Sequence, residues 1–144
     1  MYSFGELAKN ITKIANGLRD ETFDIIKNHE KYVVELNSEE QLFKKGIDSK
    51  GSKLAPYAES TKKAKKRKGQ PTDRTTTRDS KEFHELFDIN FLGDAFDITS
   101  YADYTQFLTA RYGDDIFGLT DESLTKLIEA YIIPDLLKYV LRNI

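Results

Sequence analysis

The first third of the chain carries the apolar pattern of a helix. Its apolar residues recur at alternating spacings of three and four, which places them on one stripe of a helix. The members of this stripe are Phe4, Leu7, Ile11, Ile14 and Leu18. Ser3 with Glu6 forms a capping box at the start. The spacing predicts one long helix, or two collinear ones, that reaches Asn37.

A short helix and a polar segment are predicted next. Ser38 followed by Gln41 forms a second capping box, and it predicts a short helix that Gly46 terminates. The following residues are mostly polar and contain few apolar anchors. We therefore expect a basic loop or arm at about 48–73 within a single domain, 1–144. Residues 59–68 are able to form a helical turn or two.

Partial alternation of apolar and polar positions predicts a small antiparallel sheet. The alternation gives a hairpin over residues 83–99, with its turn at Gly93-Asp94. Apolar side chains share one face of its first strand: Phe83, Phe87, Ile89 and Phe91. Residues 74–78, with three consecutive threonines, predict a third strand.

The C-terminal third returns to helical spacing. A helix is predicted from Tyr101 until Gly113, and Thr120 caps a final helix. Pro134 lacks a backbone donor and its ring clashes with the carbonyl of Ala130, so a kink is expected there. The chain is therefore predicted to be an α+β protein with a long N-terminal helix, a small antiparallel β-sheet and a C-terminal helix kinked near Pro134.

Composition narrows the classes of protein and of site. The chain has 144 residues, the length of one domain, with 32% charged residues and a mean hydropathy of −0.57. Because Cys is absent, there is no disulfide, thiolate nucleophile or cysteine-based metal site. No apolar stretch reaches the roughly 20 residues that cross a bilayer, and the first residues do not resemble a signal peptide. We expect no membrane partner and synthesis in a cytoplasm.

Charge is distributed unevenly along the chain. Residues 61–78 hold eight Lys or Arg against one Asp, a balance of +7. Residues 82–144 hold twelve Asp or Glu against four Lys or Arg, a balance of −8, although the whole chain sums to −2. This asymmetry predicts a partner of opposite charge, such as the next copy of the same protein.

The inventory of reactive side chains predicts no enzyme. Neither His29 nor His84 has a Ser, Cys or second His at the spacing of a triad or a metal site. The chain also has two acidic pairs, Asp94 with Asp97 and Asp114 with Asp115. Each pair lies beside a glycine, where short acidic side chains usually cap backbone donors. We predict no catalytic residue, no cofactor and no metal site, and an enzyme that relied on isolated carboxylates remains the third alternative.

Residues 61–78, the cationic segment, are the part of the chain whose composition indicates a function. Its side chains are able to neutralise DNA phosphates, to dock on an acidic protein surface, or simply to face water. A nuclear-localisation signal is a further alternative. The candidate contact residues are Lys62, Lys63, Lys65, Lys66, Arg67, Lys68, Arg74 and Arg78.

The order of residues in 46–83 resembles a known family. A G-x-D-x-x-G turn is followed by Leu-x-x-Tyr, by Thr-x-x-x-Lys, by a basic spacer, and by Arg-Asp-Ser-x-x-Phe before the hairpin. The residues of this motif are Gly46, Asp48, Gly51, Tyr57, Thr61, Lys65, Asp79 and Phe83. This pattern, with the later segment 112–119, resembles the bacteriophage virion morphogenesis and tail completion proteins, which are head-to-tail connector or neck components.

The resemblance implies a non-enzymatic virion component that is made in the bacterial host cytoplasm and assembles as a ring. Its implied partners are portal, adaptor or tail proteins, with packaged DNA passing through the lumen. The alternative is a small DNA-binding or packaging-associated protein that uses its basic loop on phosphates.

Overall fold

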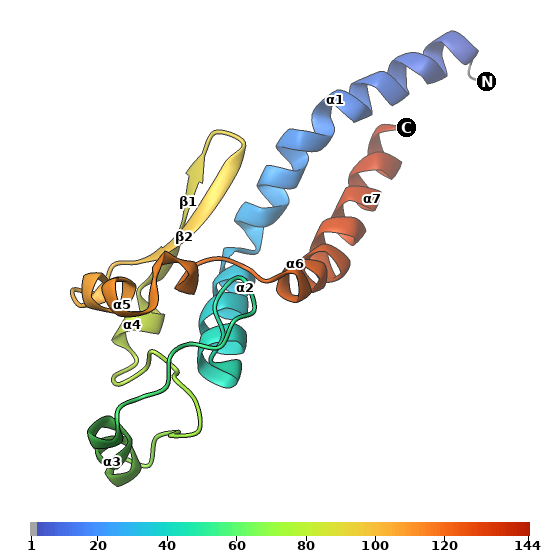
Figure 1. Cartoon of the computed structure of the whole chain (residues 1–144). Coiled ribbons are helices and arrows are strands. Elements are labelled where there is room, and N and C mark those ends of the chain that lie inside the picture. Colours follow the sequence, from blue (N-terminus) through green and yellow to red (C-terminus); the bar gives the residue numbers. More distant parts are fainter. Residues whose placement is uncertain (1–2) are drawn as a thin grey trace.

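A computed structural model describes residues 3–144, and its first third is one nearly continuous helical rod (Figure 1). The rod consists of α1 (Phe4–Asn28), α2 (Glu30–Glu35) and the π-helical segment η1 (Leu36–Lys45). The predicted capping box is confirmed, because the Ser3 hydroxyl accepts from the Glu6 amide at 3.1 Å and the Glu6 carboxylate accepts from the Ser3 amide at 2.9 Å. Gly46 ends the rod with a left-handed φ of 63°.

The second predicted capping box is wrong. Ser38 lies inside the continuous helix, and its hydroxyl donates to the Val34 carbonyl at 2.9 Å instead of capping a new helix. The apolar stripe of the rod therefore continues through the capping signal, because burial in the core outweighs the local preference of Ser for an N-cap.

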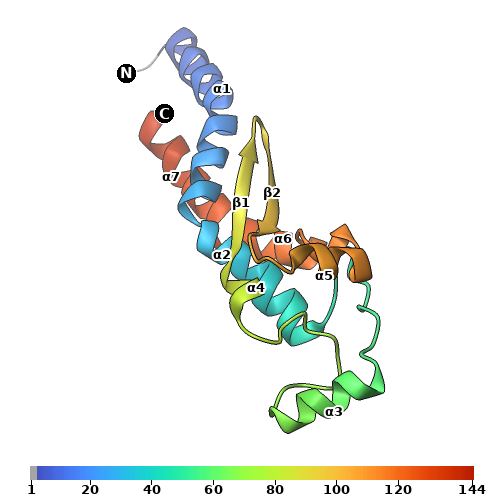
Figure 2. The same ribbon diagram turned by 90° about the vertical axis from the view of Figure 1, so that its left-hand side faces the viewer.

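The hairpin forms as predicted, but later in the chain. Strands β1 (Phe87–Leu92) and β2 (Ala95–Ser100) pair antiparallel, from Phe87 opposite Ser100 to Leu92 opposite Ala95. Figures 1 and 2 show the hairpin lying along α1. Phe83 lies in the short helix α4 (Glu82–Glu85) and not in a strand, yet it is fully buried.

The predicted third strand at 74–78 is wrong. Thr77 has a φ of 58°, which interrupts an extended backbone, and the Thr76 amide is bound by the Tyr57 hydroxyl at 2.9 Å. Thr75 is buried and donates to the Ala55 carbonyl at 2.5 Å. The strand propensity of threonine thus yields to local side-chain hydrogen bonds.

Four helical elements and a 3-10 turn complete the chain. They are α5 (Thr105–Tyr112), the turn η2 (Asp114–Ile116), α6 (Asp121–Leu127), the π-helical turn η3 (Ile128–Ile132) and α7 (Ile133–Asn143). Tyr101 precedes α5, so that helix is shorter than predicted. Thr120 caps α6 as expected, accepting from the Ser123 amide at 3.1 Å. Near Pro134, where a kink was expected, the helix contains the π-helical turn η3. This turn includes Ala130, whose carbonyl receives no α-helical hydrogen bond because Pro134 has no N–H.

Helix α7 returns antiparallel along α1 (Figures 1 and 2). A Cβ on Gly17 would stand 2.1 Å from the Tyr139 hydroxyl, so glycine permits the close approach of the two helices. His29 lies in the same contact, 3.2 Å from the Asp135 carboxylate and stacked on Tyr131 with ring centroids 3.9 Å apart. Among the helices of residues 3–144, none has the length and apolar character that spanning a membrane requires.

The core lies where the lower half of the rod meets α4, the hairpin and the segment that leads into α6. Its most deeply buried apolar side chains are Val33, Leu36, Leu42, Phe83, Ile116 and Leu127. The upper half of α1 and the helix α3 (Glu59–Arg67) extend away from this core in opposite directions (Figure 2).

Candidate interaction surface around the basic arm

The turn at the base of the arm accounts for three residues of the motif. Gly46 and Gly51 both have left-handed φ values, and a Cβ on Gly46 would stand 2.8 Å from the Thr75 carbonyl oxygen. The Asp48 carboxylate accepts from the amides of Lys50 and Ser52 at 3.0 and 2.9 Å. The G-x-D-x-x-G pattern therefore builds a tight turn whose carboxylate is occupied by backbone donors.

This turn docks on the second segment of the resemblance. The Ser49 amide donates to the Asp115 carbonyl at 2.7 Å, and the Lys50 ammonium is 3.1 Å from the Asp115 carboxylate. Gly118 approaches the same turn, where an added Cβ would stand 3.1 Å from Ser49 Cβ. Two segments some seventy residues apart thus form one rigid base.

Two buried amides, missed by sequence reasoning, fasten this base to the helical rod. Asn37 donates to the Ile116 carbonyl and accepts from the Gly118 amide, both at 2.9 Å. Gln41 donates to the Gly118 carbonyl and accepts from the Thr120 amide, also at 2.9 Å. The signal available in the sequence was a pair of amides four residues apart beside apolar core positions.

The basic run itself is helical, and one of its lysines is not free. In α3, Lys65 is only 6% exposed. Its ammonium donates to the Arg78 carbonyl at 2.7 Å and stands 4.8 Å over the Tyr57 ring. Lys65 therefore fastens α3 to the returning chain. Because its side chain is buried there, Lys65 has a structural role and is not a contact residue for a partner.

The other motif residues near α3 support the same contact. The Tyr57 hydroxyl bonds Thr76, and Thr61 is half-buried over a cavity of about 450 Å³ between α3 and α5. Lys68 donates to the Asp79 carboxylate at 2.8 Å, and this hydrogen bond lowers the pKa of Asp79. Lys68 is therefore paired with a carboxylate of the same chain.

Arg74 and Arg78, which follow α3 in the chain, also have partners within the chain. Arg74 donates to the Phe43 carbonyl at 2.7 Å, and the Arg78 guanidinium stands 3.9 Å over the Phe43 ring. Arg78 also forms an ion pair with Glu39 and has a side chain only 15% exposed. These contacts join the returning chain to the rod and leave Arg78 poorly placed for phosphates.

His84 completes this cluster in neutral form. Its Nδ1 accepts from Arg78 at 2.9 Å, so its Nε2 carries the proton and donates to the Thr77 hydroxyl at 2.9 Å. That hydroxyl in turn donates to the Thr76 carbonyl at 2.6 Å. Burial, with the nearby Arg78 charge, lowers the pKa of His84 to about 3. The strained φ of Thr77 is held by this chain of bonds.

Three cations remain available to a partner. Lys63, Lys66 and Arg67 lie at helical spacing on the outer face of α3, and within residues 3–144 they form no ion pair. Lys62 is 3.4 Å from the Glu59 carboxylate. The sequence candidates therefore separate into a braced inner set and an outer face, which we call the basic face and define as Lys63, Lys66 and Arg67.

An acidic groove lies on another side of the molecule. It has a volume of about 720 Å³ and runs between α2 with η1 on one side and α4 with β1 on the other. Five carboxylates and three cations line it. The carboxylates are Glu30, Glu35, Glu39, Glu85 and Asp88, and the cations are Lys31, Arg78 and Lys81. Because His84 is neutral, the groove carries a net charge of −2.

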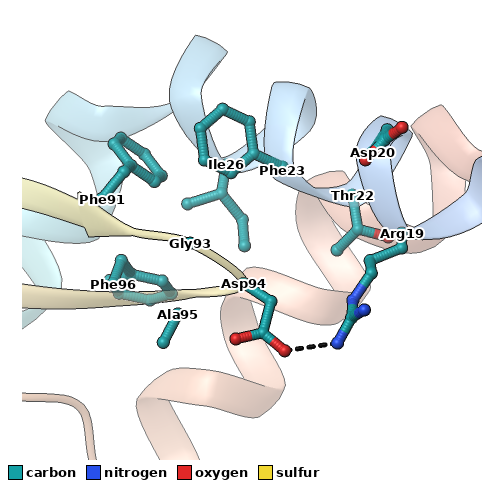
Figure 3. A pocket seen from close by; sticks show the side chains of 10 residues that line it. All are labelled: Arg19, Asp20, Thr22, Phe23, Ile26, Phe91, Gly93, Asp94, Ala95 and Phe96. Atoms are coloured by element: carbon teal, nitrogen blue, oxygen red, sulfur yellow. Dashed lines mark hydrogen bonds and ion pairs between the residues drawn. The ribbon is translucent and has the colours of Figure 1, made fainter.

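A second cavity, of about 460 Å³, separates α1 from the hairpin tip (Figure 3). Phe23 packs on Phe91 with ring centroids 4.6 Å apart, and Arg19 forms an ion pair with Asp94 across the opening. Asp94 therefore bridges helix and hairpin. Within residues 3–144, no three His, Cys, Asp or Glu side chains are grouped as metal ligands.

Comparison with protein-family models, with curated proteins and with solved structures finds no match. The resemblance to phage tail completion proteins therefore stays a prediction from the motif.

Proposed function

We propose that this chain is a non-enzymatic structural subunit of a tailed-phage virion, a neck, head-to-tail connector or tail completion protein that assembles as a ring. The observation that carries the proposal is the basic face of α3, which stands away from the core on a braced base. The motif of residues 46–83 supplies the assignment to a virion.

The brace matters because an interaction element works best when it is pre-organised. Lys65, Tyr57 and the turn at Gly46 hold α3 in one position, so little conformational entropy is lost when the helix meets a partner. The cations of the basic face are then presented together.

The acidic groove is the matching surface on a neighbouring copy. Donor and acceptor are different patches of the same chain, so the contact is heterologous and leads to a ring when the rotation closes. Opposite charge would direct the encounter and fix its register, whereas packing around the cations would supply affinity. Portal, adaptor or tail proteins would then bind the assembled ring.

A charge exchange tests this contact. The variant K63E/K66E/R67E should lose the ring, and E30K/E85K/D88K should lose it as well. A chain that carries both sets should assemble again, because the charges are complementary once more. The matched control K9E/K13E/K53E has the same net charge as the first variant and should assemble like the parent. Light scattering and electron microscopy at low and high salt provide the readout.

Two results would contradict the proposal. A parent that stays monomeric at about 100 µM and low salt has no ring contact of this strength. Absence of the protein from purified particles, or failure to copurify with portal and tail proteins, would remove the virion assignment even if rings form.

DNA binding is the second candidate, and it uses the same basic face. Three phosphate contacts predict that the logarithm of the binding constant falls with the logarithm of salt with a slope of about −2.7. Filter retention of duplex DNA measures this slope, and K63E/K66E/R67E should abolish retention while K9E/K13E/K53E preserves it. If the parent retains no DNA at low salt, this candidate fails.

A further inference from the structure

A row of large apolar side chains lies exposed on α1 and α7, and none of them belongs to the basic face or lines the acidic groove. On α1 the row consists of Phe4, Leu7 and Ile11. On α7 it consists of Ile133, Leu137 and Leu141, followed by the C-cap residue Ile144. Phe4 is 93% and Leu141 71% exposed. On α1 the row continues the stripe of Ile14, which is buried, and Gly17 in the next turn meets Tyr139 of α7. The first turns of α1 thus extend an internal interface beyond the end of α7.

Helix geometry places the two rows on the same side of the pair. The face of α1 toward α7 is marked by buried Ile14 and Ile25 and by Gly17, which meets Tyr139. At 3.6 residues per turn, the α1 row lies roughly a sixth of a turn from that face. The face of α7 toward α1 is marked by Tyr139 and by half-buried Leu136 and Asn143, and the α7 row lies roughly a third of a turn from it in the same sense. Because α1 and α7 are antiparallel, as Figure 1 shows, equal senses of rotation bring both rows to one side of the pair.

The α1 row also has the spacing of a helix-packing seam. Residues 4, 7, 11, 14 and 18 alternate at three and four, as the a and d positions of a coiled coil do. Ala8 and Ala15 flank the row on the side away from α7, and both are small enough to let another helix approach closely. A helix in contact only with α7 would not need this apolar stripe on its first turns, which lie beyond the end of α7.

The area of the row matches one half of a protein interface. If a large apolar side chain exposes roughly 170 Å² when free, these exposed fractions amount to about 700 Å² per copy. The largest apolar patch of a typical monomer is about 300–600 Å², and one partner in a standard interface buries about 800 Å².

We infer that this face is covered by the same face of a second copy, so that α1 and α7 of two chains form an intermolecular four-helix core. A two-fold axis near the middle of the α1 row would place Leu7 of one copy close to Leu7 of the other. The pairing uses neither α3 nor the acidic groove, so it is independent of the ring contact proposed above.

Sedimentation equilibrium of the whole chain tests the inference. In the K63E/K66E/R67E background, which removes the proposed ring contact, the protein should still be a dimer. Adding I11D or L141D should weaken dimerisation at least a hundredfold. The matched controls K13D and K138D, on polar faces of the same helices, should change it less than threefold. Because all four sites are exposed, circular dichroism should show an unchanged helix content.

A cross-link provides the second measurement. The chain has no cysteine, so L7C introduces a single thiol, and a short bismaleimide should join two copies at Leu7. The same reagent should leave S60C, on α3, unlinked. An L7C chain that remains unlinked would overturn the symmetric pairing. A monomer at about 100 µM would also overturn it, as would equal masses for I11D and its parent. Cosedimentation of monomers with lipid vesicles would assign the face to a membrane surface instead.

Discussion

Asn37 should contribute more to stability than any exposed residue of its helix, and Asn37→Ala measures that contribution. The side chain is fully buried and makes two hydrogen bonds of 2.9 Å with backbone atoms of Ile116 and Gly118. Alanine leaves a buried carbonyl and a half-buried amide without partners. Each such group costs about 1–3 kcal/mol, and alanine returns about 0.6 kcal/mol through its helix propensity.

We therefore expect Asn37→Ala to lower the free energy of unfolding by about 2–5 kcal/mol. At about 3 °C per kcal/mol for a chain of this size, Tm should fall by about 6–15 °C. Urea denaturation followed by circular dichroism gives the difference directly. Asn28→Ala, an exposed position in α1 without such bonds, should stay within about 0.5 kcal/mol of the parent.

A double-mutant cycle with Gln41→Ala sharpens the test. Both amides hold the same segment, 116–120, so the second substitution should cost less after the first, with a coupling of at least about 1 kcal/mol. A loss below about 1 kcal/mol for Asn37→Ala would refute the reasoning, because it would mean that water satisfies both backbone groups equally well.

Three further outcomes are expected. In urea denaturation, Gly46→Ala should lower the free energy of unfolding by at least about 1 kcal/mol more than Gly51→Ala. Both substitutions cost about 1–2 kcal/mol because the backbone φ is left-handed, but only at Gly46 does an added Cβ meet a carbonyl oxygen. Equal losses of stability would contradict this. Between pH 7 and 5 the parent should lose stability as pH falls, by up to about 1.4 kcal/mol per pH unit. The reason is that the unfolded chain binds a proton at His84 near its ordinary pKa of 6.5, whereas the pKa of His84 in the folded chain is about 3. His84→Gln should flatten this slope, and an unchanged slope would show that another group titrates. Lys65→Met should speed amide hydrogen exchange in residues 59–70 at least tenfold, whereas Lys63→Met should leave the exchange rate unchanged. The reason is that Lys65, and not Lys63, donates to the Arg78 carbonyl. Equal protection in both variants would contradict the role of Lys65 in holding α3.

Much of the fold was predictable because its signals are local. The stripe from Phe4 to Leu18, the Ser3 capping box, the Gly93 turn and the Thr120 cap each depend on residues within one or two turns of one another. The errors arose where a distant partner competes with a local preference. Ser38 did not cap a helix because the rod stays buried through it, and the threonines of 75–77 bonded Ala55, Tyr57 and His84 instead of a strand.

The candidate surface was located by its charge, but its composition was not predictable. In the sequence, nothing distinguishes one of the eight cations of residues 61–78 from another. Their surroundings in the fold do so: Lys65 and Arg78 hold the arm in place. Lys63, Lys66 and Arg67 face outward. No local pattern in the sequence predicted that Arg78 would stack on the Phe43 ring.

The sequence by itself determined the helical rod, the hairpin, the cationic segment and the turn at Gly46, because periodicity, capping and φ preference act between near neighbours. The tertiary structure alone decided which cations remain free, that Asn37 and Gln41 hold the segment before α6, and that α7 returns antiparallel along α1. These depend on contacts between residues that lie from 13 to 106 positions apart in the chain, and such contacts are fixed by packing and not by any local preference of the chain.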